Sequence, residues 1–91
     1  MSARGNVVLI GRKSAMDYVL SVILLFNADV EEVVLKARGR AISTAVDVAE
    51  IVKRRLLETV KVKEVGIGTD IVTLREGGRR AVSKIEITLT T

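Results

Sequence analysis

The segment from Tyr18 to Phe26 constrains the fold most, because its nine residues are apolar except for Ser21. It is too short to cross a bilayer as a helix. Apolar residues recur at the spacing of one helical face: Ala15, Tyr18, Val19, Val22, Ile23 and Phe26. Leucines occupy the other side: Leu20, Leu24 and Leu25. A helix that is apolar all round has to be covered on more than one side. We therefore expect a sheet to cover one side and a second copy of the chain to cover the other.

Strand and helix signals alternate over the first half of the chain. In order, they predict a strand over residues 6–10, a helix capped by Ser14, a turn over residues 27–29, a strand over residues 30–37, and a helix starting between Ala41 and Thr44. The first cap is supported by Asp17, which follows Ser14 by three residues. The second start stays open, because Ser43 and Thr44 are both suitable capping residues. Helical spacing predicts the buried face of the second helix: Ile42, Ala45, Ala49, Val52 and Leu56.

From Val60 onward the pattern has the period of strands. Gly66 and Gly68 predict a bulge or bend in a long third strand. Gly77 and Gly78 predict a hairpin turn with positive φ. The last strand is expected to carry three apolar residues inward (Ile85, Ile87 and Leu89) and three polar residues outward (Lys84, Glu86 and Thr88). The order β-α-β-α-β-β predicts one α+β domain over residues 1–91, with a four-stranded mixed sheet, two helices on one face and a long terminal hairpin.

Composition excludes most catalytic chemistry. The 91 residues include 15 Lys and Arg against 11 Asp and Glu, for a net charge of +4, and no Cys or His. Disulfides, thiolate and imidazole metal ligands and the usual general base are therefore missing. The acids are scattered, and Gly66-Ile67-Gly68 lacks the third glycine of a dinucleotide loop. We expect no catalysis, no cofactor and no metal. With neither a secretory pattern nor a membrane segment, we expect a cytoplasmic protein.

The cations are better organised than the acids. Lys36, Arg38 and Arg40 stand at alternate positions with no acid between them, where an apolar strand gives way to a helix. Residues two apart in a strand share a face, so Lys36 and Arg38 should point the same way. Arg40 extends that row if the strand geometry persists past Gly39. A row of cations beside a flexible turn suits a polyanion, and the alternative is a solvated loop.

Two further basic clusters have competing explanations. Residues 53–55 (Lys-Arg-Arg) fall in the last turn of the second helix, where cations complement the helix dipole. Arg75, Arg79, Arg80 and Lys84 surround the Gly-Gly turn, which predicts either an arm that reaches a partner or charges that protect strand edges. Because the only aromatic residues lie on the apolar helix, a platform for stacking bases is missing. Binding to a nucleic acid would therefore depend on phosphate contacts.

Several segments, in the same order along nearly the whole chain, resemble the archaeal chromatin protein family Alba. They are Asn-Val-Val-Leu-Ile-Gly-Arg-Lys at residues 6–13, Tyr-Val-Leu at 18–20, Lys-Ala-Arg-Gly-Arg-Ala-Ile-Ser at 36–43, Ala-Val-Asp at 45–47 and Ile-Glu-Ile at 85–87. The segment at 36–43 is the most specific of these.

The resemblance implies a fold like the C-terminal domain of bacterial translation initiation factor three. It also implies a homodimer, or a heterodimer with a paralogue, that coats double-stranded DNA on the chromosome without sequence preference. The hairpin arms would enter minor grooves while the body lies on the backbone. Many members also bind RNA. By this resemblance the nucleic-acid-binding residues are Arg12, Lys13, Lys36, Arg38, Arg40, Arg75, Arg79 and Arg80.

Two positions depart from the family pattern. The first basic residue after Gly11, commonly a lysine that can be acetylated, is Arg12 here, so acetylation would fall on Lys13. Leu56 stands where many members have a phenylalanine that contacts the next dimer along DNA. The lost ring area, worth about 1 kcal/mol, predicts weaker cooperativity or different packing between dimers, as in a second paralogue.

Two other readings compete with a DNA-coating protein. The same cations would fit the backbone of structured RNA, so a protein that stabilises or remodels RNA is the main alternative. A small assembly module that uses the apolar helix as an interface would leave the basic clusters unexplained.

Overall fold

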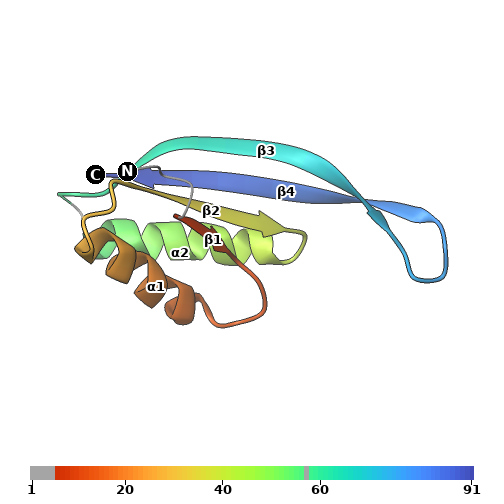
Figure 1. Cartoon of the computed structure of the whole chain (residues 1–91), viewed down its shortest axis with the longest axis horizontal. Coiled ribbons are helices and arrows are strands. Elements are labelled where there is room, and N and C mark those ends of the chain that lie inside the picture. The colour runs from red at the N-terminus through yellow and green to blue at the C-terminus, as the bar shows by residue number, and fades with distance from the viewer. Residues whose placement is uncertain (1–5, 57) are drawn as a thin grey trace.

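The computed structural model describes residues 6–56 and 58–91. The elements are β1 (Val7–Leu9), α1 (Ala15–Asn27), β2 (Glu32–Arg38), α2 (Ala41–Arg55), β3 (Lys61–Thr73) and β4 (Arg79–Thr90). Both helices lie on one face of the sheet, and the β3–β4 hairpin extends well past them (Figure 1). The predicted α+β class and the β-α-β-α-β-β order are confirmed.

The sheet has the strand order β1-β2-β4-β3. The β1–β2 pair is parallel, and the β2–β4 and β3–β4 pairs are antiparallel, so the sheet is mixed as expected. The parallel pair follows from α1, because two neighbouring strands that run the same way need a crossover connection. Neither helix, in the part of the chain described, is long and apolar enough to span a membrane.

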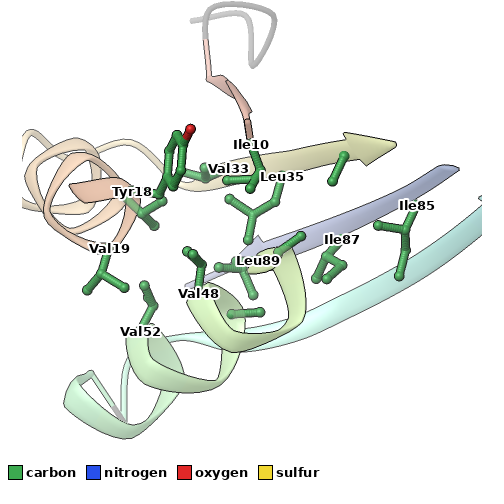
Figure 2. Close-up of a cluster of buried hydrophobic side chains, with 14 of the residues drawn as sticks. Ile10, Tyr18, Val19, Val33, Leu35, Val48, Val52, Ile85, Ile87 and Leu89 are labelled. Atoms are coloured by element: carbon green, nitrogen blue, oxygen red, sulfur yellow. The ribbon is translucent and has the colours of Figure 1, made fainter. Parts of the chain in front are cut away.

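The core lies between the sheet and the two helices (Figure 2). Alternate residues of the two central strands are buried there: Val33, Leu35, Ala37, Ile85, Ile87 and Leu89. The helices contribute mainly small and β-branched side chains, including Val19, Val22, Ala45, Val48 and Val52. Burial of each valine or leucine contributes roughly 1.5–3 kcal/mol. The inward set predicted for the last strand is confirmed. On the opposite face, Thr88 follows the predicted alternation but is only 7% exposed.

Both helices start within the predicted positions, α1 directly after Ser14 and α2 at Ala41, but the expected side-chain caps are not formed. Ser14 precedes α1, but its side chain makes no capping hydrogen bond; instead the Asp17 amide donates to the Ser14 carbonyl oxygen at 3.1 Å. For α2, neither of the two suggested caps is used, because the helix already begins at Ala41. Ser43 lies inside the first turn, and its hydroxyl donates to the Arg40 carbonyl oxygen at 3.5 Å. The turn at Gly39, with φ of +56°, starts the helix before either hydroxyl residue.

The predicted bulge at the glycines of β3 was wrong. The register shifts between Val62 and Glu64, whereas Gly66 pairs with Glu86 and Gly68 pairs with Lys84 in regular order. Gly68 has a packing reason instead: a Cβ there would come within 3.0 Å of Lys84 Cε. The glycine therefore leaves room for the Lys84 side chain to cross β3.

The hairpin turn was predicted correctly. Gly77 and Gly78 have φ of +90° and +84°. The Leu74 amide donates to the Gly78 carbonyl oxygen at 3.0 Å, which closes the turn. We call the distal part of this hairpin, residues 69–83, the arm. The arm makes the molecule elongated, with extents of 47 × 27 × 18 Å.

Candidate nucleic-acid interface

The loop between β1 and α1 carries Arg12 and Lys13, both exposed. Tyr18 holds this loop, because its hydroxyl oxygen accepts hydrogen bonds from the amides of Gly11 at 2.8 Å and Lys13 at 3.2 Å. The rest of Tyr18 is buried in the core (Figure 2). Sequence reasoning assigned Tyr18 only to the apolar face. The sequence did contain a signal for this second role, because Tyr18 carries a hydroxyl group and lies within one to two helical turns of the basic loop.

The loop between β2 and α2 presents Arg38 and Arg40. Arg38 ends β2, Gly39 turns the chain, and Arg40 already has helical φ and ψ of −64° and −22°. The strand geometry does not persist past Gly39, so Arg40 does not extend the row of Lys36 and Arg38. The turn is fixed to the root of the arm, because the Gly39 amide donates to the Ser83 carbonyl oxygen at 2.9 Å.

These two loops lie at the same end of the molecule. Because β1 and β2 are parallel, their carboxyl ends meet at one edge of the sheet. The amino-terminal ends of α1 and α2 point to that end as well, and the arm projects from it (Figure 1). Each helix amino terminus carries a partial positive charge of about half a unit. The fold thus adds two helix dipoles to the cations of both loops.

The arm carries the third set of predicted cations. Arg75 lies in the turn, and Arg79 and Arg80 begin β4; all three are exposed. Successive residues of a strand point to opposite faces, so Arg79 and Arg80 present charge on both sides of the arm. Across the described residues, no acidic side chain comes within ion-pair distance of these three arginines, of Arg12, of Lys13 or of Arg40.

The sheet face opposite the helices carries cations that are already paired. Lys36 Nζ lies 3.8 Å from Glu86 Oε2, and Arg38 Nη1 lies 3.7 Å from Asp70 Oδ2. Lys84 Nζ lies 2.7 Å from Asp70 Oδ1. The contact with Lys84 lowers the pKa of Asp70, and Asp70 in turn raises the pKa of Lys84. Lys36 and Arg38 are thus on one face, as predicted, but their acidic partners come from strands distant in sequence.

The remaining predicted positions lie at the other end. Residues 53–55 form the last turn of α2, where their charges complement the helix dipole and lie away from the loops and the arm (Figure 1). Leu56 follows α2, is half-buried and packs against the edge of the protein's own core. No group of acidic side chains in the described ranges is close enough to hold a metal ion.

Fold and charge together define a small α+β protein with a basic end and a basic two-stranded arm. Residues 6–69 match the Alba family. The chain is 49% identical over 85 residues to the DNA/RNA-binding protein Alba of Methanococcus maripaludis, covering 92% of this chain and 96% of that protein. The chain therefore belongs to the Alba family.

Solved structures agree with this assignment. Alba from Thermoplasma volcanium superposes with a TM-score of 0.88 at 40% identity, covering 94% of this chain and all of the other. ALBA1 from Trypanosoma brucei gives a TM-score of 0.76 at 30% identity, covering 94% of this chain and 68% of the other. The family match over residues 6–69 includes both basic loops and Leu56, whereas the arm arginines lie beyond it.

Proposed function

We propose that this protein binds double-stranded DNA through its backbone, without sequence preference, and acts as an architectural protein that coats and compacts the chromosome in the cytoplasm. The observation that carries this proposal is the convergence of the two basic loops, two helix amino termini and the basic arm at one end. The relative from Methanococcus maripaludis is named a DNA/RNA-binding protein, which supports the same class of ligand. The role requires no catalysis, cofactor or metal.

The binding geometry divides into body and arm. Arg12, Lys13 and Arg40 of the body would contact phosphates, together with Lys36 and Arg38 once their acidic partners release them. The arm would enter the minor groove, which is about 6 Å wide. Gly77 and Gly78 suit this entry because the two residues without side chains keep the turn narrow. The tip arginines would then meet phosphates on both walls of the groove.

We further propose that the single domain, residues 1–91, works as a homodimer or as a heterodimer with a paralogue. The helix-side face of β3 supports this, because Ile67 is 86% exposed and Val65 and Ile71 are exposed beside it. On α1, Leu20 and Leu24 are also exposed, as a helix that is apolar all round requires. A second copy that covers the β3 face would remove three exposed apolar side chains from water, Ile67 among them.

Two residues would modulate assembly and binding. Leu56 would contact the neighbouring dimer along DNA, with a smaller surface than phenylalanine offers. Lys13 would be the acetylation site, since its side chain is exposed on a loop at the basic end. Neutralising Lys13 would remove one phosphate contact without disturbing the hydrogen bond that its backbone amide donates to Tyr18.

RNA is the second candidate ligand, because the same cations can contact an A-form backbone and the relative's name includes RNA. A salt titration on random-sequence duplex DNA and on structured RNA of equal length tests both. Comparable affinity for unrelated duplexes, with log K falling steeply and linearly against log salt, is the expected result. Much tighter binding to RNA would move the protein to the RNA class, and no salt-sensitive binding to either would refute both proposals.

A pair of variants tests the location of the interface. Arg40→Ala, at the basic end, should weaken binding to all duplex sequences equally and lower the salt slope by roughly one unit. Arg54→Ala removes the same charge from the exposed far end of α2 and should leave affinity close to that of the unmodified protein. Equal losses from both variants would show that net charge matters rather than place, and would contradict the proposed interface.

A further inference from the structure

Two cations face each other directly at the root of the arm. In the antiparallel β2–β4 register, Arg38 is the partner of Lys84. Opposed residues of such strands share a face, with Cβ atoms about 5 Å apart, and like charges in this arrangement repel. An anion beside both members relieves this repulsion.

Asp70 supplies that anion from the third strand. Its two carboxylate oxygens are divided between the cations, with Oδ1 2.7 Å from Lys84 Nζ and Oδ2 3.7 Å from Arg38 Nη1. Gly68, the strand partner of Lys84, leaves the space through which the lysine chain reaches Asp70. The carboxylate thus bridges two cations with two oxygens, as a phosphate group can.

All three side chains remain accessible to a ligand. The side chain of Arg38 is 59% exposed, and those of Lys84 and Asp70 are 40% and 35% exposed. The site also lies beside the Gly39 turn, which is hydrogen-bonded to Ser83 at the arm's root. It therefore falls between the body loops and the arm, where a nucleic-acid backbone would pass.

We propose that Arg38 and Lys84 form a two-cation site for one backbone phosphate, and that Asp70 occupies this site in the free protein as an internal competitor. The proposal rests on the proposed nucleic-acid-binding function and adds Lys84 and Asp70 to the interface. Phosphate entry displaces the carboxylate from both cations. Asp70 thereby weakens binding and reduces its salt dependence, because it acts as a built-in counterion that has to be displaced.

The test compares Asp70→Asn with a matched control, Glu32→Gln. Glu32 pairs with Lys63 at 2.9 Å. It is the first residue of β2, and this strand starts at the end of the molecule away from the arm (Figure 1). Both variants remove one negative charge and free one lysine, and Asp70→Asn also frees Arg38. Binding to a 30-base-pair duplex (about three helical turns) and the salt concentration that elutes each protein from heparin are measured, with folding checked by circular dichroism.

Asp70→Asn is expected to bind the duplex roughly two- to five-fold more tightly than the control, given the usual strength of exposed ion pairs. Its salt slope should be steeper by about one unit. Adding Lys84→Gln to Asp70→Asn should abolish the gain, because the second cation is then missing. Affinity equal to or below that of Glu32→Gln, or a gain that survives Lys84→Gln, would overturn the proposal.

The heparin measurement distinguishes a failure of this proposal from a failure of the proposed function. If none of the proteins binds duplex or RNA, the proposed function fails. The two-cation anion site would still stand in that case if Asp70→Asn elutes from heparin at higher salt than Glu32→Gln and loses the difference with Lys84→Gln. Co-elution of the two single variants, alongside normal duplex binding, would overturn the Asp70 proposal alone.

Discussion

Removing one oxygen atom, in Tyr18→Phe, should loosen the basic loop after β1. The Tyr18 hydroxyl accepts two backbone hydrogen bonds, from Gly11 at 2.8 Å and from Lys13 at 3.2 Å. Its ring is buried, so phenylalanine keeps the core contacts and changes only the polar end. The loop then loses both of the hydrogen bonds that Tyr18 provides to it.

The magnitude follows from these two bonds. Each contributes a net 0.5–1.5 kcal/mol or so in a typical protein. Because Gly11 and Lys13 are exposed, water can replace part of what is lost, which favours the lower half of that range. We expect the free energy of unfolding to fall by roughly 1–2 kcal/mol in total. For a domain of this size, each kcal/mol lowers Tm by about 4–8 °C.

Denaturant unfolding at fixed protein concentration measures the stability loss, and duplex binding at low salt measures the effect on Arg12 and Lys13. Val48→Ala is the control, since it removes buried methyl groups from α2 without touching the loop. Tyr18→Phe should weaken DNA binding more than Val48→Ala does at equal loss of stability. An unfolding free energy within a few tenths of a kcal/mol of that of the unmodified protein, which is the usual effect of an ordinary surface substitution, would refute the reasoning.

Five further results are expected. Gly39→Ala should destabilise the protein by roughly 1–2 kcal/mol in denaturant unfolding, because alanine resists the φ of +56°. The lowered pKa of Asp70 means that its stabilisation is present above the ordinary aspartate pKa of 3.8 and is lost on further acidification, so acid titration of Asp70→Asn should show a shallower fall. The raised pKa of Lys84 means that the stabilisation from its charged form is fully present below the ordinary lysine pKa of 10.5 and is lost as the pH rises further. Leu56→Phe should raise binding cooperativity, and an unchanged isotherm would contradict the dimer–dimer role. Ile67→Lys should leave the monomer folded but shift light-scattering mass from dimer to monomer, since this side chain is 86% exposed.

Periodic features of the chain were predictable from sequence. The inward residues of β4 repeat every second position, and the buried residues of α1 follow a helical spacing, so each element identifies its own buried face. The positive φ of Gly77 and Gly78 was also predictable from local sequence, because two adjacent glycines between strands are typical of a hairpin turn that requires positive φ. These signals are local, and the fold class follows from their order.

Features that depend on register between distant strands were not predictable. Gly66 and Gly68 suggested a bulge, but the shift lies at Val62/Glu64, and Gly68 instead makes room for a lysine on β4. Arg38 and Asp70 are far apart in sequence and meet only because β2, β4 and β3 are neighbours in that order. A sequence scan therefore reports a row of cations and misses the acid that the sheet brings to it.

The distinction between paired and unpaired cations suggests how affinity is distributed over this surface. Among the described residues, Arg12, Lys13 and Arg40 have no acidic partner, so a phosphate meets them without displacing an internal charge. Under our proposal, Arg38 would have to leave Asp70 first, which would make its contribution smaller and dependent on competition. A protein that coats DNA without sequence preference has to release it as well as bind it. Under the proposed function, unpaired cations at the loops and arm would supply attraction over any sequence, and the paired cations on the sheet would limit how tight the complex becomes.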